Sequence, residues 1–158
     1  MLLRTEDFKC EAIIAGLFAE NDLASPANEA IRDDVLDYID KYEPQFIRDF
    51  GMPQTEYSAL VEYAGQQEQQ DDRKNAILKR IRFSLAHYVS YWWLRSQNVT
   101  PIGGVALGSE NGQRTPTADT QTLLWNQMVA NSTDLYHEMY RKGHPDTEVF
   151  RRINSMGI

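Results

Sequence analysis

Histidines and a single cysteine are the side chains of this sequence best suited to chemistry. His87 lies in an aromatic stretch beside Tyr88 and Tyr91. We expect a hydrogen-bonded core residue there, because a general base needs an orienting partner and a substrate cleft. His137 precedes Glu138 as in one half of a zinc-binding helix, but an arginine stands where the second histidine of that motif belongs. The histidines therefore predict neither a catalyst nor a metal ligand.

The cysteine and the glycines give no stronger signal for chemistry. Cys10 is the only cysteine, so it forms neither an intrachain disulfide nor a structural zinc site of familiar spacing. Gly103, Gly104 and Gly108 match no dinucleotide or phosphate loop, because no strand precedes them and no Gly-Lys-Ser/Thr follows. We therefore expect no catalytic residue, no metal site, no cofactor and no enzymatic activity.

Charge divides the chain into two unlike halves. The net charge is −7. Residues 1–72 contain 17 acidic and 5 basic side chains, a net charge of −12, whereas residues 73–158 contain 6 acidic and 11 basic ones, a net charge of +5. Either the halves pack together and neutralise each other, or oppositely charged faces meet between neighbouring copies and favour head-to-tail contacts. A tight nucleic-acid binder usually carries a basic excess, which this chain lacks.

Hydrophobic periodicity predicts a mainly α fold, a small multi-helix bundle in a single domain over residues 1–158. Pro44 predicts a kink or the start of a new helix, and Gly51 a helix end. The acidic residues of the first long helix are expected on a solvated face. The expected helices cover residues 28–51, 55–64, 72–97 and 118–142, followed by a short tail helix over 146–154. Within the N-terminal extension 1–27 the pattern favours an opening helix from Thr5, although Ile13-Ile14 fits extended chain equally well.

The central helix and the segment after it carry the strongest functional signal. Between Ile77 and Trp93 the apolar stripe is wider than one partner helix covers, so we expect several neighbouring helices or another chain to bury it. Trp92 and Trp93 point about 100° apart, and one partner surface rarely hides both. Residues 99–117 are glycine-rich and apolar, with a short hairpin as one option. Apolar side chains in a loop of this length need a cover.

We interpret residues 99–117 as an assembly loop that contacts another subunit. The pattern predicts a self-assembling structural protein. No membrane contact is expected, because the apolar run from Leu85 to Leu94 is shorter than the roughly 20 residues that a membrane span needs. The predicted subunit interface comprises Trp93, Val99, Ile102, Gly103, Gly104, Val105, Leu107 and Arg114.

The order of these features resembles a family of phage proteins. The resemblance covers roughly residues 28–142 and is carried by three features. They are the stretch from Ile39 to Phe46 with Gly51 after it, the helix 85–92 that leads into Thr100-Pro101-Ile102-Gly103-Gly104-Val105, and the return helix with Trp125-Asn126. They are similar to head–tail connector, or head-completion, proteins of tailed bacteriophages and prophages.

This resemblance implies a ring beneath the portal, built from copies of one chain, with the loop 99–117 reaching the adjacent subunit. It implies contacts with portal and tail proteins, and double-stranded DNA that passes through the ring without sequence-specific binding. The protein would belong to the virion and be assembled in the bacterial cytoplasm. The chain departs from the family in its acidic N-terminal half and its longer N-terminal extension.

An alternative function also fits the sequence, a soluble helical adaptor or small DNA-packaging subunit that binds DNA or a motor protein. Its candidate residues are the basic side chains at the start of the central helix. Such clusters are more often a solvated helix start. The cluster comprises Arg73, Lys74, Lys79, Arg80 and Arg82.

Overall fold

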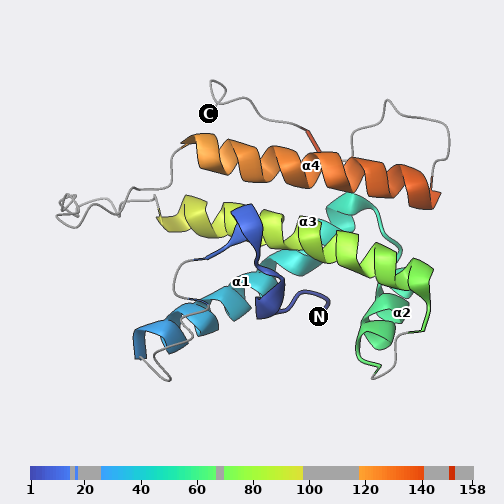
Figure 1. Cartoon of the computed structure of the whole chain (residues 1–158), viewed down its shortest axis with the longest axis horizontal. Helices are drawn as coiled ribbons and strands as arrows, with labels where there is room; N and C mark the ends of the chain where they lie inside the picture. Colours follow the sequence, from blue (N-terminus) through green and yellow to red (C-terminus); the bar gives the residue numbers. More distant parts are fainter. Residues whose placement is uncertain (15–16, 18–25, 67–69, 98–117, 141–149, 152–158) are drawn as a thin grey trace.

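The protein is a small, mainly α, multi-helix bundle, seen here in a computed structural model (Figure 1). The structure describes residues 1–14, 17, 26–66, 70–97, 118–140 and 150–151. No strand occurs in these ranges. Their four α-helices are α1 (Pro26–Phe50), α2 (Gln54–Ala64), α3 (Asp72–Gln97) and α4 (Ala118–Tyr140). The expected hairpin, and all of the expected tail helix except residues 150 and 151, lie outside the described residues.

Helix α3 is the centre of the bundle. Figure 1 shows α4 running antiparallel along one side of α3, while α1 crosses the opposite side and α2 lies near the beginning of α3. Every side chain from Ser84 to Tyr91 is buried. The cover comes from α1, from α4 and from the N-terminal segment. The expectation that several neighbours bury this wide apolar stripe is confirmed, and its own chain supplies them.

The α1 helix runs without interruption through Pro44, so the expectation of a new helix at that residue is wrong. The proline ring is exposed, whereas Ile39, Phe46 and Ile47 are buried on the other side of the helix. Burial of these apolar side chains offsets the roughly 3 kcal/mol that an internal proline costs.

Gly51 ends α1 as expected. Its φ of 80° lies in the left-handed region that favours glycine. Its N–H donates to Arg48 O over 3.0 Å, and the N–H of Met52 donates to Ile47 O over 3.2 Å. This pair of hydrogen bonds is a Schellman motif, which satisfies the last carbonyls of the helix and turns the chain toward α2.

The N-terminal segment forms two 3₁₀ turns, η1 (Thr5–Asp7) and η2 (Cys10–Ala12), so the expected opening α-helix is wrong. Some of its backbone groups close these turns, as the N–H of Asp7 does on Arg4 O over 3.0 Å, and others bond to the bundle. The Ser90 hydroxyl, for example, donates to Ala12 O over 2.7 Å. A helix would need that carbonyl for its own ladder. Tertiary contacts therefore override the local helical pattern.

A buried carboxylate anchors this segment to α1. Glu43 is 2% exposed and accepts the backbone N–H of Leu2 at 2.7 Å, that of Leu3 at 3.0 Å and the Tyr57 hydroxyl at 2.6 Å. Arg82 holds the same segment from α3, with its Nε donating to Leu2 O over 2.8 Å. Buried polar groups need such partners, so these contacts determine where the N-terminal segment lies.

Candidate functional site

Trp93 is the one predicted interface residue that the structure describes, and its own chain covers it. It is 9% exposed, and its ring meets Tyr38 of α1 edge-on at 5.3 Å between centroids. Trp92 stacks on Tyr42, one turn further along α1, also at 5.3 Å. A single helix therefore covers both tryptophans, contrary to our expectation, because side chains four residues apart on α1 lie on one face. We accordingly leave Trp93 out of the proposed interface.

The other seven predicted interface residues lie in residues 98–117, outside the described part of the chain. Their anchoring points are nevertheless known. Because α3 and α4 run antiparallel, Gln97 and Ala118 lie at the same end of the bundle (Figure 1). Any contact that residues 98–117 make begins from that end.

His87 is a hydrogen-bonded core residue, as expected. It is 1% exposed. Its Nδ1–H donates to Phe83 O over 2.8 Å, and Nε2 lies 3.0 Å from the side-chain amide of Gln127 on α4. Burial lowers the pKa of His87 below its usual value of 6.5. Since both ring nitrogens are occupied, the residue ties α3 to α4.

The lowered pKa of His87 predicts a loss of stability in acid. The unfolded chain binds the proton more tightly than the folded chain, so the free energy of unfolding falls as pH drops through about 6.5 toward the lower folded pKa. The slope reaches at most about 1.4 kcal/mol per pH unit. Urea unfolding at about pH 7.5 and pH 5 should show a smaller loss for His87→Gln than for the wild type. Equal losses would remove His87 as the cause.

The basic cluster of α3 does not form one open surface. Arg80 pairs with Glu138 of α4 at 2.5 Å, and Arg82 lies 3.7 Å from Asp7 besides its bond to the N-terminal segment. Lys74 lies 3.8 Å from Asp71. Arg73 and Lys79 make no ion pair with another described residue. Three of the five cationic groups thus have an acidic partner within the chain.

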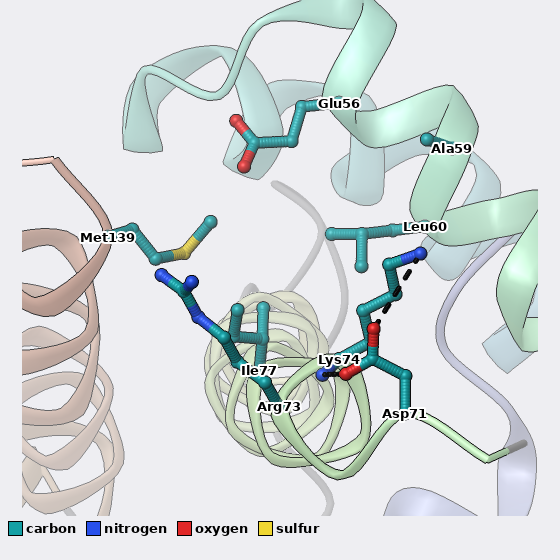
Figure 2. Close-up of a pocket in the computed structure, with 8 residues that line it drawn as sticks. All are labelled: Glu56, Ala59, Leu60, Asp71, Arg73, Lys74, Ile77 and Met139. Atoms are coloured by element: carbon teal, nitrogen blue, oxygen red, sulfur yellow. Dashed lines mark hydrogen bonds and ion pairs between the residues drawn. The ribbon is translucent and has the colours of Figure 1, made fainter.

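Figure 2 shows a cavity of about 340 Å³ between α2, the beginning of α3 and the end of α4. Its apolar walls are Ala59 and Leu60 of α2, Ile77 of α3 and Met139 of α4. The Glu56 carboxylate of α2 faces this space, and the exposed Arg73 side chain reaches toward Met139 from the opposite side. The two charged groups form no ion pair with each other.

The Glu56 carboxylate is held in place by Tyr140. The tyrosine hydroxyl donates to Glu56 Oε2, and burial, followed by this hydrogen bond, raises the pKa of Tyr140. The sequence did not single out Glu56, and it indicated Arg73 only as a member of the basic cluster, because each is an ordinary charged residue near a helix start. Only the meeting of three helices turns them into the two sides of one cavity.

A second cavity, of about 410 Å³, lies beside the N-terminal segment. Cys10, Lys79 and the 40% exposed Phe83 line it. His87 also borders it, but both of its ring nitrogens are already bonded. The imidazole therefore offers no free ring nitrogen to the exposed thiol.

The acidic residues of α1 between Glu29 and Asp40 form a solvated face, as expected. Glu29, Asp33, Asp37 and Asp40 recur at helical spacing, and all are exposed. Among the described residues, no group of three or more histidine, cysteine or acidic side chains is placed to bind a metal ion. Nor does any helix in the described ranges have the length and apolar character needed to cross a membrane.

Comparison with known proteins assigns this chain to no family. No protein-family model, no curated protein and no solved structure matches this chain.

Proposed function

We propose that this protein is a non-enzymatic structural subunit of a phage or prophage particle, and that its copies form a ring at the head–tail junction. The assembly loop 99–117 makes the subunit contacts. The ring binds portal and tail proteins, and double-stranded DNA passes through it without sequence-specific contacts. The mainly α bundle agrees with the fold that the sequence resemblance implies.

One observation carries this proposal: α3 and α4 share a buried apolar core, and the loop that joins them adds further apolar residues to the sequence. Leu85, Val89, Leu124 and Met128 of these two helices are fully buried. The loop contributes Val99, Ile102, Val105 and Leu107. Apolar residues in a loop of this length need a cover, and a second subunit can supply it.

The acidic face of α1 supports a role around DNA. Its four exposed carboxylates repel the phosphates of a passing duplex, whereas a basic wall would hold them. We therefore place the α1 face toward the channel of the ring. In that position it would let the genome slide.

Replacing Gly103 and Gly104 together with valine is expected to abolish assembly and to leave the bundle folded. Two β-branched residues restrict the backbone of the loop, whereas the described core does not involve these positions. Native mass spectrometry should count oligomers of the full chain, alone at high concentration and mixed with portal rings of the same particle. Circular dichroism should give an unchanged Tm.

Gly65→Ala is the matched control, because Gly65 has a φ of −84° and an added Cβ meets nothing closer than 3.5 Å. It should assemble as the wild type does. Normal assembly by the double valine variant would contradict the role of the loop. A wild-type chain that neither forms oligomers nor binds portal rings would contradict the proposed function itself.

The alternative function, an adaptor that binds DNA, relies on the basic cluster of α3. The ion pairs of Lys74, Arg80 and Arg82 leave two of its five cations without an acidic partner among the described residues. A cluster reduced in this way gives a weaker electrostatic attraction to phosphate. The structural role in a ring is therefore the function that we propose.

A further inference from the structure

The helix ends that flank the assembly loop and the cavity of Figure 2 lie at opposite ends of the bundle. The loop follows Gln97 and precedes Ala118 in the sequence, whereas the cavity is bounded by Arg73 and Ile77 near the beginning of α3 and by Met139 near the end of α4. Gln97 lies twenty helical positions after Ile77, a distance of about 30 Å at 1.5 Å per residue.

We propose that this cavity is the docking site for the assembly loop of a second copy, so that neighbouring subunits join head to tail. The inference rests on the proposed function only in requiring that the chain assembles. The inference adds the surface on the neighbouring subunit that receives the loop. It does not depend on where in a particle the ring is placed.

Chain length keeps Arg114 of the same copy out of the cavity. Arg114 is four residues before Ala118, so its backbone reaches back at most about 14 Å at 3.6 Å per residue. This reach falls short of the length of α4 that leads from Ala118 to Met139 and the cavity, about 32 Å at 1.5 Å per residue. A neighbouring copy has no such restriction.

The chemistry of the cavity matches that of the loop. The walls formed by Leu60, Ile77 and Met139 suit aliphatic side chains. Glu56 faces the cavity as an anion, for which Arg114 of the loop is the cationic partner; planar guanidinium and carboxylate groups pair well. A charge pair beside an apolar contact fixes the register of docking more than it adds affinity.

A contact between two different surfaces of the same chain is heterologous. Such contacts propagate from copy to copy and close into a ring when the rotation permits. A contact of one surface with itself would instead stop at a dimer. The placement of the cavity and of the helix ends that flank the loop at opposite ends of the bundle therefore agrees with a ring.

A charge reversal tests the pairing of Glu56 with Arg114. Glu56→Arg and Arg114→Glu should each weaken assembly of the full chain about tenfold or more, because every contact then joins like charges. Mixed in equal amounts, the two variants should assemble again, since each cavity now finds an opposite charge in the other variant. Native mass spectrometry should detect oligomers in which the two variants alternate, with equal numbers of each.

Glu62→Arg is the matched control, an exposed acid on the same helix, and it should assemble normally. Ala59→Trp gives a second test, because it fills the cavity without touching the bond from Tyr140 to Glu56; it should block assembly at an unchanged Tm. Assembly of all these variants at the wild-type level would overturn the docking site and leave the ring intact. A wild-type chain that never assembles, even with portal rings, would overturn both.

Discussion

Glu43→Ala is expected to lower the free energy of unfolding by about 3–5 kcal/mol. The substitution leaves the buried N–H groups of Leu2 and Leu3 and the hydroxyl of Tyr57 without their acceptor. Each buried polar group without a partner costs about 1–3 kcal/mol. The N-terminal segment would also lose its anchor on α1. Urea unfolding at neutral pH, followed by circular dichroism, measures the change.

Asp40→Ala is the matched control, since Asp40 is an exposed carboxylate one turn earlier on the same helix. Its effect should stay within about 0.5 kcal/mol. Tyr57→Phe removes one of the three donors and should cost about 1 kcal/mol. If Glu43→Ala cost no more than the Asp40 control, the carboxylate would not be what anchors the segment.

Phe46→Ala should destabilise the bundle by about 3–5 kcal/mol. Phe46 is 1% exposed, and its ring lies 5.4 Å from that of Phe150, 5.5 Å from Tyr88 and 5.9 Å from Phe50. Removal of the ring leaves a cavity where α1, α3 and the C-terminal residues meet. It also takes away the stacking partner of Phe150, so the fluorescence of the neighbouring Trp125 should change with the loss of stability.

Phe83→Ala provides the comparison, because Phe83 is the same residue type at 40% exposure. It should cost about 1 kcal/mol, since less apolar area leaves water there on folding. Equal costs for the two substitutions would show that the aromatic cluster around Phe46 is not a packed core.

The sequence predicted the helices well because their apolar residues repeat at helical spacing over long stretches. Such a stripe must face a core wherever it lies, so α2, α3 and α4 begin and end close to the expected residues. The helix end at Gly51 was predicted equally well, since few other residue types adopt its backbone angles. These features depend on residues that are close together in the sequence, so the sequence alone is enough to predict them.

The predictions from the sequence were wrong where contacts between residues distant in the sequence determine the local structure. Thr5 begins a pattern that favours a helix, but Glu43, Arg82 and Ser90 bind the backbone of the N-terminal segment and hold it in short turns. Glu43 itself gave a signal, because it lies between Ile39 and Phe46 on the buried stripe of α1. A charged residue in that position needs buried donors, although the sequence does not name them.

Local pattern alone determined that this chain is a mainly α bundle with a glycine-rich, apolar sequence between α3 and α4, since helical periodicity and turn residues act within a few positions. The tertiary structure decided that one helix covers both Trp92 and Trp93, and that Glu56 and Arg73 border one cavity. It also decided that this cavity lies at the opposite end of the bundle from the end of α3 and the beginning of α4. These arrangements depend on the angles at which the helices cross, and packing between residues distant in the sequence sets those crossing angles.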